Sequence, residues 1–110
     1  MLFVESSGFT RRLPELLDDQ EYALLQAKLV LCPASGSLIQ GTGGLRKLRW
    51  RRPGMGRRGG VRVIYYWWTR RDTIHLLSIY AKSRTSELTA KDKRLLSKFV
   101  EGLAGHEQEQ

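Results

Sequence analysis

Basic and aromatic side chains crowd the middle of the sequence, and this combination is suited to chemistry on a polyanion. The chain has 19 lysine and arginine residues against 11 aspartate and glutamate residues, a net charge of +8. No acidic residue occurs between Glu21 and Asp72. Cations in such density bind phosphate backbones, and interleaved aromatic rings such as Trp50 can stack on bases. The span predicts nucleic-acid binding. A basic face that serves solubility alone is the weaker interpretation, because solubility favours mixed signs of charge.

A glycine pattern in the same span matches the nucleotide loop G-x-G-x-x-G-x-V at Gly54, Gly56, Gly59 and Val61. The pattern lacks its usual context. A dinucleotide loop opens a helix, and a kinase loop is followed by a strand with a V-A-I-K lysine, whereas here the sequence continues as VRVIYYWW. A chain of 110 residues is also about one small domain. We therefore interpret the segment as an arginine-rich connection between strands.

The sequence gives little support for a metal site, a disulfide bond or a membrane-spanning segment. Cys32 is the single cysteine, and it ends an apolar helical stripe before Pro33, which predicts a buried side chain. His75 and His106 are isolated, so we expect no metal and no cofactor. No apolar stretch is long enough to span a bilayer, and the N-terminus lacks the features of a signal peptide. We expect a cytoplasmic protein that does not bind membranes.

The hydrophobic patterns predict an α+β domain with a small antiparallel sheet, an N-terminal helical hairpin and a C-terminal helix. A strand is expected at 2–6, a helix from Phe9 to Leu17 and a second helix that starts at Asp18 and ends before Pro33. Residues 34–44 are expected to form a loop. Three antiparallel strands are expected at 45–51, 60–68 and 73–82.

A capping pair at Thr89 and Asp92 predicts the start of the last helix. Its expected apolar stripe comprises Leu95, Leu96, Phe99, Val100 and Leu103. We expect a single domain over residues 1–104, followed by a frayed polar tail at 105–110.

Side chains two residues apart along a strand lie on the same face of the sheet. In strand 45–51 it separates Leu48 and Trp50 from a basic set on the opposite face, Lys47, Arg49 and Arg51. Tyr80 and Lys82, two residues apart at the end of the third strand, also share a face.

Three stretches, GTGGLRKLRW, RRGGVRVIYYW and LLSIYAKSRTSELTAKDKRLL, resemble the HigB branch of the RelE superfamily of toxin–antitoxin toxins. The resemblance covers almost the whole chain. It implies a RelE-like fold and a ribosome-dependent endoribonuclease, an mRNA interferase that cuts messenger RNA in the decoding site and inhibits translation. It also implies contacts with ribosomal RNA and a HigA-like helix-turn-helix antitoxin as partner.

Such a ribonuclease uses the ribose 2′-hydroxyl as nucleophile, so it needs a proton acceptor, a proton donor and charge stabilisation, but no metal. By the resemblance, Arg62 binds the scissile phosphate, Lys82 is the second catalytic cation, and Lys47 and Tyr80 complete the catalytic set. The expected RNA-binding residues are Arg46, Arg49, Arg51, Arg57 and Arg58. The identities of the general base and the general acid stay open.

Two other functions are compatible with the same residues. A ParE-like toxin shares the fold and an antitoxin partner but poisons gyrase. A noncatalytic RNA-binding module would use the same cations to hold a backbone without cutting it. In either toxin, we expect an acidic or amphipathic antitoxin segment to cover surface near the sheet or the last helix.

Overall fold

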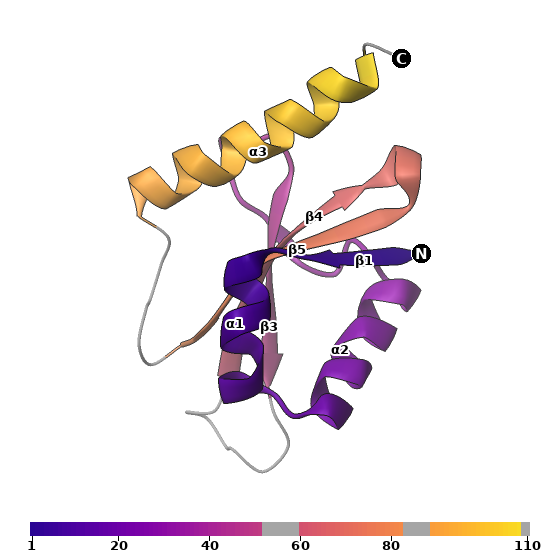
Figure 1. The fold of residues 1–110 in the computed structure, drawn as a ribbon, viewed down its shortest axis with the longest axis vertical. Coiled ribbons are helices and arrows are strands. Elements are labelled where there is room, and N and C mark those ends of the chain that lie inside the picture. The colour runs from indigo at the N-terminus through magenta and orange to yellow at the C-terminus, as the bar shows by residue number, and fades with distance from the viewer. Residues whose placement is uncertain (52–59, 83–88, 109–110) are drawn as a thin grey trace.

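The computed structural model describes residues 1–51, 60–82 and 89–108, the last five by their backbone alone. The chain forms one strand, then two helices, then four further strands and a last long helix (Figure 1). The elements, in chain order, are β1 (Leu2–Glu5), α1 (Ser7–Leu16), α2 (Asp19–Leu31), β2 (Ser37–Leu38), β3 (Leu45–Arg51), β4 (Gly60–Trp68), a short 3₁₀ turn (Thr69–Arg71), β5 (Thr73–Ala81) and α3 (Ala90–Gln108). Helix α3 thus continues into the segment predicted to be a frayed tail.

The described strands form one sheet of five in the order β1-β5-β4-β3-β2, and the predicted α+β class is confirmed. Strands β3 to β5 pair antiparallel, as expected. Strand β2 also pairs antiparallel with β3, but β1 runs parallel to β5. A local pattern cannot reveal that pairing, because β1 and β5 are separated by most of the chain. Strand β2 lies in the predicted loop 34–44, and its two residues are too few to produce a periodic signal.

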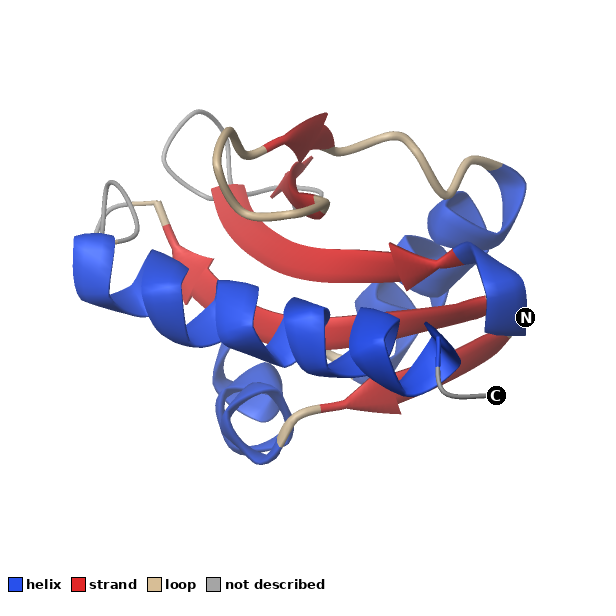
Figure 2. Cartoon of the chain, turned by 90° about the horizontal axis from the view of Figure 1, so that it is seen from above, coloured by secondary structure: helices blue, strands red, loops and turns tan. Residues whose placement is uncertain are grey.

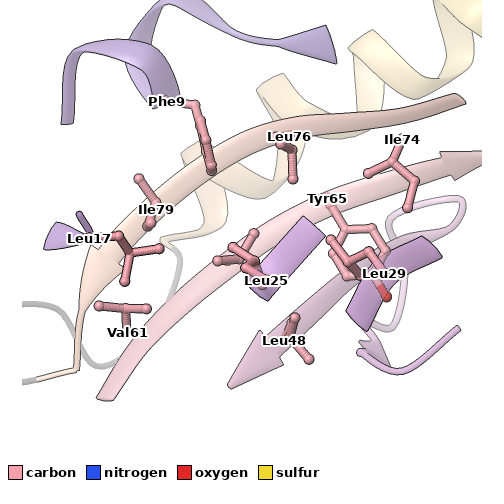
Figure 3. Close-up of a cluster of buried hydrophobic side chains, with 11 residues drawn as sticks. Phe9, Leu17, Leu25, Leu29, Leu48, Val61, Tyr65, Ile74, Leu76 and Ile79 are labelled. Carbon is pink, nitrogen blue, oxygen red and sulfur yellow. The ribbon is translucent and has the colours of Figure 1, made fainter. Parts of the chain in front are cut away.

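The helices cover both faces of the sheet, as the view in Figure 2 shows for α3. On one face, α1 and α2 enclose the larger core, where Phe9, Leu25 and Leu29 pack against strand residues such as Val61 and Tyr65 (Figure 3). On the other face, Val100 and Leu96 of α3 pack in a smaller cluster with Leu45, Ile64 and Tyr80. Burial of these apolar side chains is the main driving force for the three-layer arrangement.

Side-chain caps fix where the helices begin. The Ser6 hydroxyl accepts a hydrogen bond from the Phe9 amide at 3.1 Å and starts α1. Asp18 and Glu21 form a reciprocal capping box at the start of α2, with distances of 2.7 and 2.9 Å. Thr89 and Asp92 make the same exchange before α3, as the sequence predicted.

Two predicted core positions lie outside the core. Cys32 is exposed rather than buried, because α2 ends at Leu31 and Cys32 takes the C-cap conformation, so the helical stripe does not continue to it. Leu95, assigned to the apolar stripe of the last helix, is 59% exposed. No helix in the described part of the chain is both long and apolar enough to cross a membrane.

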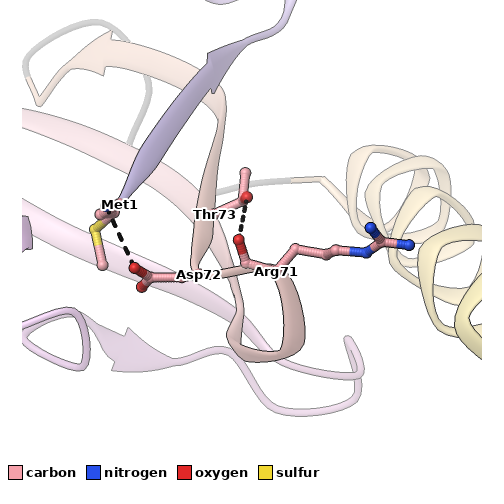
Figure 4. A network of polar contacts seen from close by, with 4 residues as sticks. All are labelled: Met1, Arg71, Asp72 and Thr73. Atoms are coloured by element: carbon pink, nitrogen blue, oxygen red, sulfur yellow. Dashed lines mark hydrogen bonds and ion pairs between the residues drawn. The ribbon is translucent and has the colours of Figure 1, made fainter.

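The N-terminus is tied to the turn between β4 and β5 (Figure 4). The Met1 ammonium lies 3.3 Å from the Asp72 carboxylate, and the Leu2 amide donates to the Asp72 carbonyl at 3.0 Å. Asp72 has a left-handed backbone, with φ of 47°, and the Thr73 hydroxyl donates to the Arg71 carbonyl. These contacts align β1 beside the start of β5.

Strand β5 contains an extra residue that changes which face its second half presents. Tyr65 pairs with Leu76 and Ile64 pairs with Ser78, so Leu77 has no partner on β4. This is a β-bulge. Leu77 packs in the cluster beneath α3, and Tyr80, three residues later, packs in the same cluster. With strict alternation, Tyr80 would instead face α1 and α2.

Candidate nucleic-acid interface

Three of the predicted site residues form a row across the three central strands. Arg49 on β3 pairs with Arg62 on β4, and Arg62 pairs with Tyr80 on β5. Neighbouring strands lie about 4.8 Å apart, so residues in register with their side chains on one face are close neighbours. Regular alternation places Arg49 on the face of Leu45, and Arg62 on that of Ile64, which is the face covered by α3. The sequence predicted the residues of this row, but not their registration.

A concave site of about 240 Å³ lies at the end of this row. Its lining residues are Arg49, Trp50, Arg51, Gly60, Arg62 and Lys82. We refer to the four charged members as the cation cluster. Arg49, Arg51 and Lys82 are exposed and Arg62 is half-buried, so the cluster is open to a ligand.

The cation cluster is a single-sign charge field. No carboxylate is among its lining residues, and none of its four members forms an ion pair with any residue in 1–51, 60–82 or 89–108. Like charges held this close repel each other, and a bound anion relieves the repulsion. The arrangement favours a phosphate group, which accepts hydrogen bonds from several guanidinium groups at once.

Gly60 leaves the space in which the Arg62 side chain lies. A Cβ atom at residue 60 would be 3.3 Å from Arg62 Nη1, a contact tighter than most real Cβ contacts. The guanidinium also donates a long hydrogen bond, 3.4 Å, to the Val61 carbonyl. Sequence reasoning placed this glycine at the start of the predicted strand 60–68 and gave it no role in the site. The signal that could have identified it is its position two residues before a strand arginine.

Lys82 closes the far side of the site. It follows the last residue of β5, and its amide donates to the Gly60 carbonyl at 3.1 Å, so the ladder between β4 and β5 continues up to it. Across the sheet, Gly60 also pairs with Arg51. Lys82 and Arg51 therefore lie on opposite sides of Gly60, the first residue of β4.

The structure separates the other predicted residues from this cluster. Lys47 precedes Arg49 on β3 and pairs with Ile64 of β4. It does not line the site. Arg46 donates to the Ala34 and Gly36 carbonyls at 3.2 and 2.8 Å, so its guanidinium tethers the segment before β2. Tyr80 is only 5% exposed and packs beneath α3. Arg57 and Arg58 lie outside the described residues.

A metal centre has no candidate ligands in the described part of the chain. No group of three or more histidine, cysteine, aspartate or glutamate side chains there could hold an ion. His75 is buried against Trp68 and Phe99, with ring-centroid distances of 5.7 and 5.4 Å. Burial lowers the pKa of this imidazole, which suits a neutral aromatic packing residue.

Comparison with solved structures places this architecture among known folds. The chain is similar to a double mutant of the E. coli toxin RelE in the free state, with a TM-score of 0.50 and 18% sequence identity. The match covers 77% of this chain and 86% of that chain. The fold is RelE-like. No family model matches the sequence. At this identity, the RelE likeness supports the predicted fold, and the HigB branch stays a prediction.

Proposed function

We propose that the chain is a toxin of a toxin–antitoxin system that cuts messenger RNA on the ribosome. The observation that carries the proposal is the cation cluster. Its members Arg49 and Arg62 are in register with Tyr80 across three strands, and the described residues that line the site include no carboxylate. A site of this charge and size holds one phosphate with its ester oxygens. The RelE-like fold gives the proposal its biological setting. The HigB-like assignment, the decoding site as the place of cleavage and a HigA-like antitoxin belong to the same proposal.

The reaction that fits the site is attack of a ribose 2′-hydroxyl on the adjacent phosphorus, with departure of the 5′-oxygen. The bond to the 2′-oxygen forms as the bond to the 5′-oxygen breaks, and the product ends are a cyclic phosphate and a 5′-hydroxyl. Arg62 and Arg49 stabilise the charge that accumulates on the nonbridging oxygens. The chain's own cations fill this role, so the proposed reaction is metal-independent.

Proton transfer falls to the lysines in this proposal. Lys82 lines the site as an ammonium group and can donate a proton to the leaving oxygen. Lys47 lies on β3 just outside the site and is the amine candidate for accepting the 2′ proton. Tyr80, buried beneath α3, supports the position of Arg62 rather than stacking on an exposed base. We class it as a positioning residue.

Primer extension on a messenger RNA, in a reconstituted translation reaction with and without ribosomes, tests the proposal. We expect ribosome-dependent cuts by the parent protein that disappear in Arg62→Ala and in Lys82→Ala. Lys28→Ala is the matched control, because Lys28 is an exposed cation on α2, outside the site. Growth arrest without cuts in any sample would contradict the proposal and favour the ParE-like alternative, which a gyrase supercoiling assay would then detect. RNA binding without cuts or growth arrest would favour the noncatalytic module.

A further inference from the structure

Helix α2 has apolar side chains on its outer face as well as on the face that packs against the sheet. Leu25 and Leu29 belong to the core and are fully buried. The residues on the opposite side of the helix are exposed and apolar, and they recur at the three- and four-residue steps that form one helical stripe. They are Ala23, Leu24, Ala27, Val30 and Leu31. We call this set the α2 outer stripe.

The α2 outer stripe exposes much of its apolar surface at the side of the molecule (Figure 1). Leu31 leaves 86% of its surface exposed, and Leu24 and Val30 leave 51% each. The exposed surfaces of α1 and α3 instead carry cations such as Arg12 and Lys98. A helix that is apolar on both faces is normally covered on both, and contiguous exposed apolar surface marks a contact with another molecule. The stripe is therefore a candidate contact surface.

The charges around the α2 outer stripe differ in sign from those of the whole chain. The net charge of the chain is +8, but the segment from Glu15 to Lys28 contains four carboxylates and one cation, Lys28. Carboxylates repel phosphates, so this surface does not favour nucleic acid. A membrane surface is also disfavoured, because it binds apolar helices whose flanks are basic. These charges favour a protein as the partner.

The stripe is complementary to a second copy of itself in the antiparallel orientation. When the two helices are centred near residue 25, Ala27 of each copy lies across from Leu24 of the other, so a small side chain meets a large one. On one flank, Lys28 then comes next to Glu21 of the second copy, and opposite charges attract. In a parallel pair, Asp19 would instead come next to Glu21, and the two carboxylates would repel each other. The antiparallel orientation also aligns the helix dipoles favourably.

We infer that two copies of the chain associate through α2 as an antiparallel dimer with two-fold symmetry. A two-fold contact is the commonest way in which a chain covers a self-complementary surface. Helix α2 has 13 residues, and a pair of such helices buries less than the roughly 1,600 Å² of a standard interface. We therefore expect a reversible dimer with a Kd on the order of 100 μM.

The dimer leaves the cation cluster open. Arg49 and Arg62 lie on the face of the sheet that α3 covers, whereas α2 packs on the opposite face. The inference therefore does not depend on the proposed ribonuclease activity, and either one can fail without the other.

Sedimentation equilibrium of the full chain over a range of concentrations tests this dimer. We expect a monomer–dimer equilibrium that weakens about tenfold or more in the double variant Leu24→Glu with Leu31→Glu, because association would bury carboxylates among apolar side chains. The matched control is Leu38→Glu with Leu95→Glu, which makes the same change at two exposed leucines outside α2. It should keep the affinity of the parent protein. Thermal melts check that every variant is folded, as expected for exposed positions.

Disulfide cross-linking tests the orientation of the two helices. In a Cys32→Ser background, Ala23→Cys and Ala27→Cys are made as separate variants and then mixed. Residue 23 of one copy lies across from residue 27 of the other in the antiparallel pair, so we expect the mixed disulfide to form faster than a disulfide between identical variants. Mass spectrometry distinguishes the products. Faster cross-linking of identical variants would indicate a parallel pair and overturn the inference.

The sedimentation experiment can also overturn the inference. A parent protein that stays monomeric up to about 1 mM, tenfold above the expected Kd, would do so. Equal weakening in the control variant would do so as well, because the contact would then lie outside α2. Binding of a monomeric chain to anionic lipid vesicles that depends on Leu24 and Leu31 would contradict the dimer and assign the stripe to a membrane surface.

Discussion

Arg49 and Arg62 are direct register partners on adjacent strands, two like charges held side by side, and the described residues that line their site include no carboxylate. Cross-strand pairs of like charge destabilise a sheet, so this pair opposes folding while it creates an anion site. Conflicts of this kind between stability and local chemistry are expected where a protein binds or reacts.

Replacing Arg49 or Arg62 with glutamine should separate stability from function. Removal of one charge relieves the repulsion, and we expect the free energy of unfolding to rise by about 0.5 kcal/mol. Cleavage should fall by about a hundredfold or more, since a charge-stabilising group is lost. Urea unfolding and the cleavage assay measure the two effects. A variant that is less stable yet fully active would show that the arginine pair serves the fold.

The salt dependence of RNA binding should report how many cations contact phosphates. Each contact to a single-stranded backbone contributes about 0.7 to the slope of log affinity against log salt. We expect Arg51→Ala and Arg49→Ala each to lower the slope by about that amount. Arg46→Ala should leave the slope unchanged, because the Arg46 guanidinium is bonded to the Ala34 and Gly36 carbonyls. Anisotropy titrations at several salt concentrations with a noncleavable RNA would measure these slopes.

Acidification should destabilise the fold through His75. Burial lowers the pKa of His75, so the unfolded chain binds a proton at a higher pH than the folded chain does. Well above the unfolded pKa, His75 is neutral in both states and does not change the free energy of unfolding. As the pH falls through about 6.5, protonation of the unfolded chain lowers that free energy. The rings packed on His75, Trp68 and Phe99, carry no charge to offset a proton. His75→Phe should flatten the pH dependence of urea unfolding between about pH 5 and 7. An unchanged profile would mean that other groups cause it.

Ser6 should be worth more than an ordinary helix cap. Its hydroxyl accepts from the Phe9 amide and donates to the Leu77 carbonyl at 2.9 Å, so it holds α1 to the bulge of β5. Ser6→Ala should lower the free energy of unfolding by about 1–2 kcal/mol. Ser7→Ala, at the exposed first residue of α1, is the control and should change it much less. Equal losses in the two variants would contradict this role for Ser6.

Much of the fold follows from local sequence signals. The capping box at Asp18 and Glu21 and the alternation through residues 45–51 predict their elements closely, because both depend on neighbours in the chain. The parallel pairing of β1 with β5 could not be predicted, since it is set by tertiary packing. Cys32 shows the limit of a periodic pattern, which does not reveal where a helix ends.

The candidate site was predictable as a set of residue types and not as a geometry. The basic span without acidic residues pointed to Arg49 and Arg62, and the resemblance to the HigB branch added Lys82. The structure brings the three together. The same reasoning included Arg46, whose side chain is committed to backbone carbonyls. Composition cannot separate the two cases, because only three-dimensional contacts distinguish a cation that is available from one that is engaged.

The unpaired Leu77 also affects how this chain can be compared with others. Consider a related chain that has the same row of side chains but lacks the extra residue in the strand equivalent to β5. In that chain, the residue equivalent to Tyr80 would lie one position closer to the start of the strand. A sequence alignment without a gap would then match Tyr80 to a residue on the wrong face. Equivalent residues in this half of the strand have to be assigned by the register with β4, not by counting along the chain.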